Sequence, residues 1–209
     1  MLAKPASQLR SQQKRDRILA AMDVLLRTRP FAGISVGDLA AQARVPVATV
    51  YQRFSNDDVM GAVLLALYFA KVQEWAQRPR LKASSPSISL HAQLLEIATD
   101  AMGQIQALGH VMRPAYLYSR QHPHRAEAEW SRLEQLAREG FGAFIRTRAA
   151  DLSLPDTNHA ADVLCDLFNF MLIGPLLHDD SPRWRMPGAQ AQFAETLATL
   201  AHRYLTGKD

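Results

Sequence analysis

The sequence lacks the features that mark secreted and membrane proteins. Its 209 residues include one cysteine, Cys165, so no internal disulfide can form and a disulfide-built secreted scaffold is excluded. The longest apolar run, residues 61–70, is about half as long as a membrane-spanning helix. Residues 1–5 lack the apolar core of a signal peptide. We therefore expect a soluble cytoplasmic protein with no membrane partner.

Motifs of common enzyme chemistry are also missing. The chain has no glycine-rich phosphate loop and no His-Glu-x-x-His zinc pattern. His122 and His124 share one turn without a third ligand nearby, which is a weak metal signal. Cys165 lies in the most apolar segment, where a thiol is more often packing than a nucleophile. We predict no catalytic residues, no metal and no cofactor. An enzyme that needs His110 or Cys165 for turnover of an apolar substrate stays open as an alternative.

Positive charge is concentrated at one end of the chain. Residues 1–54 hold nine Lys and Arg against three Asp, a net charge of +6, whereas the remaining residues sum to −2. Such asymmetry favours a polyanionic partner for the basic end, although a solvated helix rich in Arg would give the same count.

Helical periodicity runs through the whole sequence, and strand signals are scarce. Apolar residues recur at steps of three and four in segment after segment, and 48% of the residues are hydrophobic, as in a globular protein. We predict an all-α protein of about nine helices. The charge boundary divides it into an N-terminal domain, residues 1–54, and a helical domain, residues 55–209.

Three short helices are expected at the basic end, over residues 16–28, 35–43 and 46–54. Pro30 ends the first helix. Ser35 and Asp38 have the spacing of a capping box at the start of the second. Pro46 suits the first turn of the third because its φ is fixed. The tight turn between the second and third helices is typical of a helix-turn-helix, in which the later helix enters the major groove of DNA.

The third helix has one face for the core and one for DNA. Val50 and Phe54 lie one turn apart and face inward. The opposite face carries small apolar residues that suit thymine methyls, a Gln that suits adenine, and an Arg that suits guanine or phosphate. Hydroxyl side chains suit phosphate oxygens. The expected DNA-contacting residues of this helix are Val47, Ala48, Thr49, Tyr51, Gln52 and Arg53.

The ordered combination of these residues resembles a known family. The segment ILAAMDVLLRTRPFAGISVGDLAAQARVPVATVYQRFSNDDVMGAVL, with its TVYQRF pattern, closely resembles the N-terminal domain of TetR-type (TetR/AcrR family) transcriptional regulators. The match covers about residues 16–65. The resemblance implies phosphate contacts at Ser35, Thr49 and Tyr51, base contacts near the remaining residues of the third helix, a homodimer on a palindromic operator, and a small-molecule effector.

The sequence departs from the family pattern at four positions. Pro30 and Arg44 stand where the family often has Gly, and Arg in a left-handed conformation would cost roughly 1 kcal/mol. Pro46 replaces a hydroxyl cap, and Asp57 replaces a Lys that contacts phosphate. Basic residues at the start of the first helix are candidates to compensate for that Lys, namely Lys14, Arg15 and Arg17.

The C-terminal helices are the expected dimer surface. A helix over residues 158–173 is apolar almost all round, which indicates burial on more than one side. Residues 189–205 form a second helix with one apolar face, and the family dimerises through two such helices per subunit. A fully internal core helix is the alternative, since periodicity does not separate self from partner. The expected interface residues are Val163, Leu167, Phe170, Phe193, Leu197, Leu200 and Tyr204.

The resemblance also implies a mostly apolar effector pocket between the middle helices. His110, Arg113 and Tyr118 could supply polar contacts there, or could be satisfied within the protein. For any single aromatic or Met residue, ordinary core packing is the favoured interpretation, because such residues fill cores by default. The candidate lining residues are Tyr68, Met102, His110, Tyr116, Phe141 and Phe168.

Together these features predict a transcriptional regulator, most simply a repressor that an effector releases from DNA. The alternative is a TetR-like small-molecule or lipid-binding protein that has lost DNA binding. It would show no salt-dependent affinity for DNA.

Overall fold

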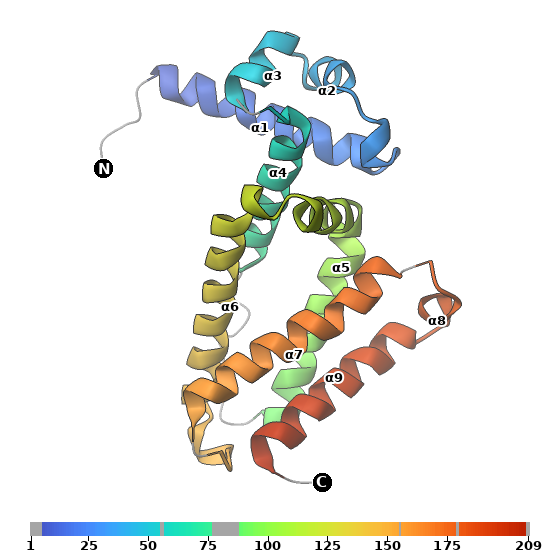
Figure 1. Cartoon of the computed structure of the whole chain (residues 1–209). Coiled ribbons are helices and arrows are strands. Elements are labelled where there is room, and N and C mark those ends of the chain that lie inside the picture. The colour runs from blue at the N-terminus through green and yellow to red at the C-terminus, as the bar shows by residue number, and fades with distance from the viewer. Residues whose placement is uncertain (1–5, 55–56, 77–87, 155, 179, 208–209) are drawn as a thin grey trace. The chain divides into compact units, whose positions relative to one another are not determined.

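The structure, a computed structural model, describes residues 6–54, 57–76, 88–154, 156–178 and 180–207, and the described residues are helical without strands. The α-helices are α1 (Ala6–Leu26), α2 (Val36–Ala43), α3 (Val47–Arg53), α4 (Val59–Ala76), α5 (Leu90–Gln121), α6 (Glu127–Thr147), α7 (Thr157–Leu177), α8 (Pro182–Arg185) and α9 (Ala189–Thr206) (Figure 1). Short 3₁₀ turns follow α1, α5 and α6. The predicted all-α class is confirmed.

The chain divides into two compact units. The first unit comprises Met1–Ala76 with His110–Glu127, and the second comprises Gln77–Gly109 with Ala128–Asp209. The long helix α5 contributes its first part to the second unit and its last part, from His110 onward, to the first.

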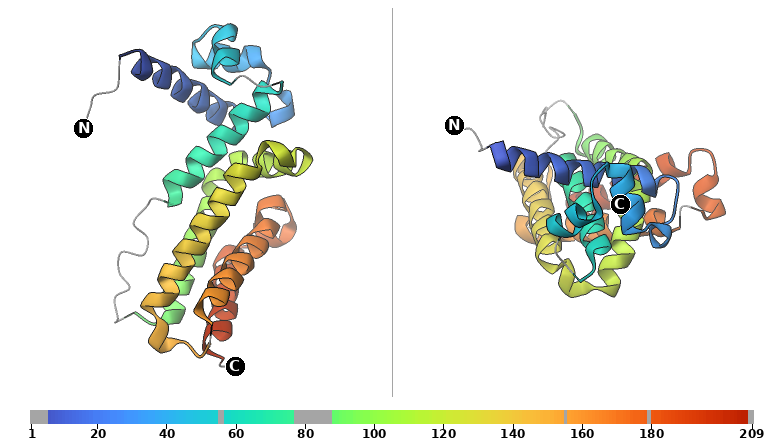
Figure 2. Two further views of the ribbon diagram at one scale, coloured as in Figure 1. Left: turned by 60° about the vertical axis from the view of Figure 1, so that its left-hand side comes forward. Right: turned by 90° about the horizontal axis from the view of Figure 1, so that it is seen from above.

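In the first unit, α1 packs against both α2 and α4, and α2 packs against α3. The core face of α1 begins at Ile18 and continues through Met22 to Leu25, which are spaced at i, i+4 and i+7 on one side of the helix. Leu39 of α2 and Val50 of α3 complete this small core. The N-terminal turns of α1 extend past α2 and α3 in both views of Figure 2.

The first helix differs most from its prediction. It was expected over residues 16–28, but it begins at Ala6 and ends at Leu26. The apolar stripe marks only the part of the helix that has a core to cover, and helix formers such as Gln, Lys and Arg extend it into solvent. Thr28 and Arg29 instead form a hydrogen-bonded turn onto Leu25.

Local chemistry explains α2 and α3. The predicted capping box is present: the Ser35 hydroxyl accepts a hydrogen bond from the Asp38 N–H at 3.1 Å, and the Asp38 carboxylate accepts one from the Ser35 N–H at 3.0 Å. Arg44 ends α2 in the left-handed conformation, with φ 53° and ψ 49°. Pro46 immediately precedes α3 as its N-cap and gives no side-chain cap.

The helix α5 is continuous through Gly109. A single helical Gly costs only about 1 kcal/mol relative to Ala, so it does not by itself end a helix. The buried residues Ile105 and Val111 on either side of the Gly supply the packing that holds the helix together.

In the second unit, α7 packs against α9, and the two helices run side by side in Figure 1. Leu164 and Phe168 of α7 and Leu197 and Ala201 of α9 are buried in this unit. By length and composition alone α7 could cross a membrane, and 39% of its apolar stretch is buried here. Two Asp residues of α7, Asp162 and Asp166, form ion pairs with Arg138 of α6 at 2.6 and 3.5 Å. The buried apolar residues of α7, such as Leu164 and Phe168, pack within the unit.

Candidate nucleic-acid interface

The exposed face of α3 is the centre of the candidate site. The predicted orientation of this helix is confirmed, because Val50 and Phe54 are buried. Tyr51 keeps 49% of its surface exposed and Val47 keeps 44%. The remaining exposed residues of this face are Ala48, Gln52 and Arg53.

Thr49 lies apart from this exposed set. It is buried at the start of α3, beside the core residue Val50. Its N–H donates to the carbonyl of Pro46 at 2.9 Å, which closes the first turn of the helix. Only 8% of the surface of Thr49 is exposed.

Ser35 takes part in a tight polar cluster. Its hydroxyl donates to Asp38 Oδ2 at 2.6 Å, and Arg29 lies 3.3 Å from the other oxygen of that carboxylate. The hydrogen bonds from the Ser35 hydroxyl and N–H lower the pKa of Asp38 to about 2. Asp38 is therefore ionised at neutral pH, and the Ser35 hydroxyl must exchange this partner in order to bind a phosphate.

Arg53 is anchored to the first helix. Its Nη1 donates to Ser11 Oγ of α1 at 2.5 Å, while the side chain remains exposed. The guanidinium of Arg15 lies 5.7 Å from the centre of the Phe54 ring, which is cation–π distance. These two contacts place the end of α3 against the first turns of α1.

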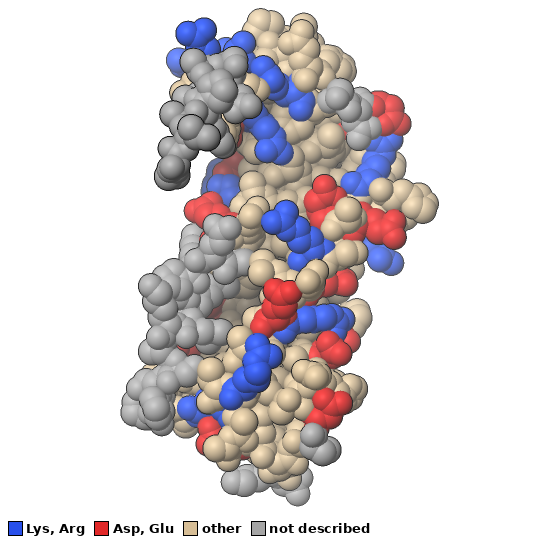
Figure 3. Space-filling model, turned by 90° about the vertical axis from the view of Figure 1, so that its left-hand side faces the viewer, with Lys and Arg blue, Asp and Glu red and all other residues tan. Residues whose placement is uncertain are grey.

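Basic side chains continue the surface along α1. Arg10, Lys14 and Arg17 line a shallow hollow of about 550 Å³ together with Gln13 and Asp16. In Figure 3, Lys and Arg side chains gather at the upper end of the visible face, where Figure 1 places α1 to α3. Of these residues, Lys14 and Arg17 were predicted from the sequence as candidates for phosphate contact, and Arg10 was not.

Two carboxylates of the first unit hold the last turns of α5. One carboxylate is on α1, and the other is in the turn before α4. Asp23 accepts a hydrogen bond from His110 Nε2 at 2.6 Å and forms an ion pair with Lys71 at 3.1 Å. Burial acts to raise the pKa of Asp23, but its polar partners outweigh burial and the pKa lies below its usual value. His110, expected as an effector contact, is thus satisfied within the first unit.

A second contact joins Tyr118 of α5 to the start of α4. The Tyr118 hydroxyl donates to Asp58 Oδ2 at 2.7 Å, and Asp58 Oδ1 accepts from the Gly61 N–H at 3.0 Å. Burial and this hydrogen bond raise the pKa of Tyr118 to about 12. A Cβ on Gly61 would overlap the Tyr118 ring, so glycine allows this close approach.

Asp57 also has a partner. Arg125 donates to its carboxylate at 2.5 Å, and this bond lowers the pKa of Asp57. Sequence reasoning noted Asp57 only as a departure and missed Asp23, Asp58 and Arg125 altogether. Their partners lie 60 to 87 positions away in the chain, and no local pattern signals contacts of that separation.

The candidate effector residues are divided between the units. Phe141 and Phe168 of the second unit form an aromatic pair with ring centres 5.2 Å apart, and Met102 is buried in the same unit. Tyr68 is buried in the first unit, to which Tyr116 also belongs.

Cys165, the residue on which the enzyme alternative depends, lies within α7. It is buried, and burial raises the pKa of its thiol. A raised pKa disfavours the thiolate that nucleophilic chemistry needs.

The candidate dimer residues also separate into two groups. Phe193 and Leu197 are buried within the second unit, with Phe193 packed on Trp184 at 5.2 Å between ring centres. In the single subunit these two residues belong to the core of the second unit. By contrast Phe170 is 71% exposed and Leu200 is 42% exposed. The other three, Val163, Leu167 and Tyr204, are half-buried.

Comparison with known proteins gives one consistent fold. No family model matches the sequence, and no curated protein matches it. A TetR family transcriptional regulator from Pseudomonas syringae pv. tomato is 23% identical with a TM-score of 0.60, over 90% of this chain and 95% of that one. A putative TetR-family regulator from Mesorhizobium loti is 16% identical with a TM-score of 0.71, over 94% and 98%. The fatty acid degradation regulator FadR from Bacillus halodurans is 15% identical with a TM-score of 0.67, over 96% and 97%.

These similarities extend over the two thirds of the chain that the sequence motif did not reach. The helix-turn-helix and the helices that follow it together have the fold of TetR-family transcriptional regulators, as the N-terminal segment predicted.

Proposed function

We propose that this chain is a sequence-specific DNA-binding regulator of transcription that acts as a homodimer on a palindromic operator and is released by a small molecule. The observation that carries the proposal is the exposed face of α3, whose outward residues suit base edges while its inward residues anchor it. The net charge of +6 over residues 1–54 supplies the attraction to DNA.

Exposed apolar residues of the second unit support the dimer. Phe170 projects from α7 and Leu200 from α9, two helices that pack together. Such residues favour a self-complementary patch, as a two-fold dimer requires. The proposed dimer face therefore consists of Val163, Leu167, Phe170, Leu200 and Tyr204.

Release by an effector requires a connection between the bound effector and the helix-turn-helix, and α5 supplies one. It begins in the second unit and ends in the first, where His110 and Tyr118 hold Asp23 and Asp58. An effector that binds beside the Phe141–Phe168 pair would act by preferring one position of this helix. It can shift operator affinity only by its differential affinity for the two states.

Selection of sites from a random duplex library at two salt concentrations tests the proposal. We expect an inverted repeat whose half-sites lie about one helical turn apart. Arg53→Ala should weaken binding to that site by roughly 1–3 kcal/mol if Arg53 reads a base, with Arg132→Ala on α6 as the charge-matched control. Absence of any binding at either salt would favour the alternative, a helical small-molecule-binding protein.

A second experiment addresses the dimer. Phe170→Glu should shift the protein to monomers in sedimentation analysis and abolish binding to the full palindrome, while Leu136→Ala on α6 should change neither. Because Phe170 is largely exposed in the subunit, its replacement should leave the helical content intact. A Phe170→Glu protein that remains dimeric would exclude this face.

A further inference from the structure

The first turns of α1 form a charged arm, defined here as residues 10–17. The core stripe of α1 begins only at Ile18, and every side chain of the arm is exposed except the half-buried Ser11. The small core of the first unit therefore does not explain why this segment exists as helix.

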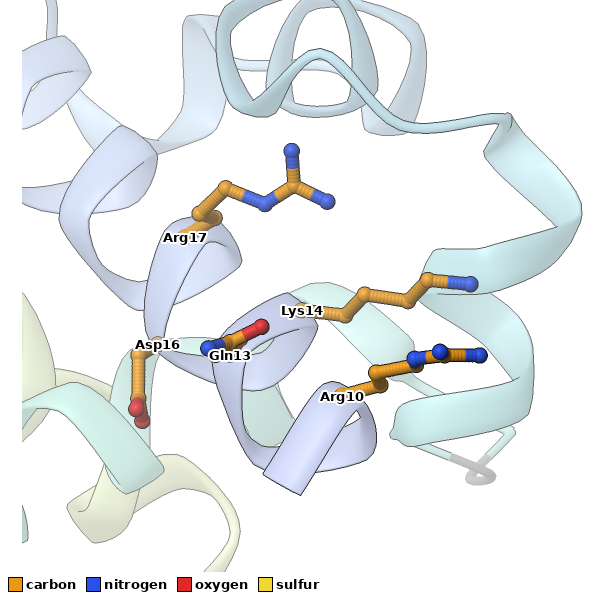
Figure 4. Close-up of a pocket in the computed structure, with 5 residues that line it drawn as sticks. All are labelled: Arg10, Gln13, Lys14, Asp16 and Arg17. Carbon is orange, nitrogen blue, oxygen red and sulfur yellow. The ribbon is translucent and has the colours of Figure 1, made fainter. Parts of the chain in front are cut away.

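The arm presents its positive charge on one face. Arg10, Lys14 and Arg17 follow each other at i, i+4 and i+7, which places them on one side of the helix. Figure 4 shows the three side chains extending from that side and Asp16 pointing away from them. None of the ion pairs found among the described residues involves these three side chains.

This arrangement is unfavourable for the isolated helix. Like charges four residues apart repel each other, and the first turn of α1 contains no acidic residue to balance the helix dipole. A polyanion bound along this face would remove both costs. The spacing of basic residues thus fits a partner with repeated negative charges.

The position of the arm indicates which polyanion. Arg53, on the DNA-facing side of α3, bonds to Ser11, and Arg15 packs over Phe54 at the end of α3. The arm is therefore continuous with the exposed face of α3, and DNA bound to α3 would lie next to the arm.

We propose that Arg10, Lys14 and Arg17 form a second DNA-contacting surface that binds backbone phosphates beside the half-site read by α3. This inference rests on the proposed function and adds contacts that position the protein without reading sequence. It also accounts for Asp57, which the Arg125 bond keeps ionised and which therefore cannot contact a phosphate.

The test uses the full-length chain with Arg10→Ala and Lys14→Ala combined, leaving Arg17 unchanged. Binding to the selected operator and to an unrelated duplex is measured by fluorescence anisotropy over a range of salt concentrations. We expect both affinities to fall by the same factor, with the slope of log K against log salt reduced by about 1 for each phosphate that the variant no longer binds. Circular dichroism verifies that α1 remains helical.

Two controls isolate the arm from overall charge. Arg132→Ala removes one positive charge from α6, and Asp16→Asn removes a negative charge from the arm's opposite side; neither should lower the slope. An operator duplex trimmed to the outer edges of its half-sites should bind the unaltered protein at least as weakly as the full duplex binds the double variant. Trimming should weaken binding of the double variant less than binding of the unaltered protein, because the variant keeps Arg17 as its one contact on the arm.

The outcomes separate this inference from the function on which it rests. If the unaltered protein selects a palindrome and the double variant matches its affinity and slope, the arm inference is overturned and the proposed function stands. A decrease confined to the selected sequence would overturn phosphate binding in favour of base reading. If no DNA binds at all, both fail.

Discussion

Two helix contacts, one within each unit of this protein, are of different kinds. In the first, single carboxylates join helices that are distant in sequence: Asp23 binds His110, and Asp58 binds Tyr118. In the second, the α7–α9 contact is apolar and includes Leu197 with no exposed surface, while the ion pairs of Arg138 lie outside it. Apolar packing fixes which helices associate, whereas directional polar contacts fix the position of one helix on another.

The largest effect is expected at the contact between α7 and α9, which apolar packing stabilises. Leu197→Ala should lower the free energy of unfolding by about 2–5 kcal/mol, because it removes buried surface and leaves a cavity between α7 and α9. Thermal and denaturant unfolding measure the change.

The matched control is Leu200→Ala, three residues along the same helix at an exposed position. At concentrations where the protein is monomeric it should cost well under 1 kcal/mol. Equal decreases for the two variants would mean that the division between core and surface on α9 is wrong.

The helix-turn-helix was predicted from the sequence better than the rest of the chain, because its structure depends on residues that are close together in the sequence. Ser35 and Asp38 are three residues apart, and their capping box is identifiable from that spacing alone. Arg44, whose place in the turn raised the question of a left-handed conformation, has that conformation at the end of α2.

Prediction was weaker where a residue's role depends on distant partners. Leu197 and Leu200 are both apolar residues of one amphipathic helix, and periodicity does not tell which faces the subunit's own core. For His110 the sequence left two interpretations open, an effector contact or a partner within the protein, because its partner Asp23 lies 87 positions earlier in the chain. The predicted bounds of α1 were wrong for a related reason. The apolar stripe of α1 indicates which residues are buried and not how long the helix is.

An intermediate effect is expected where the first unit's polar contacts depend on close approach. Gly61→Ala should cost about 1–3 kcal/mol, because the new methyl group would overlap the Tyr118 ring and displace its hydroxyl from Asp58. Chemical denaturation measures this decrease in stability.

A double-mutant cycle assigns the decrease to that contact. In a Tyr118→Ala background, Gly61→Ala should cost almost nothing, since the atoms it overlaps are gone. If the cost of Gly61→Ala is the same in both backgrounds, the strain comes from elsewhere in α4.

The smallest effect is expected at Arg44, where a local rule is broken. A non-glycine residue in the left-handed region costs about 1 kcal/mol or somewhat more, so Arg44→Gly should raise the free energy of unfolding by up to about 1 kcal/mol. The gain is limited because Gly also increases the entropy of the unfolded chain. Arg44→Ala removes the charge and keeps the Cβ, so it should give no gain. If both variants raise the free energy of unfolding equally, the destabilisation by Arg44 comes from charge repulsion among the basic residues 1–54 and not from backbone strain.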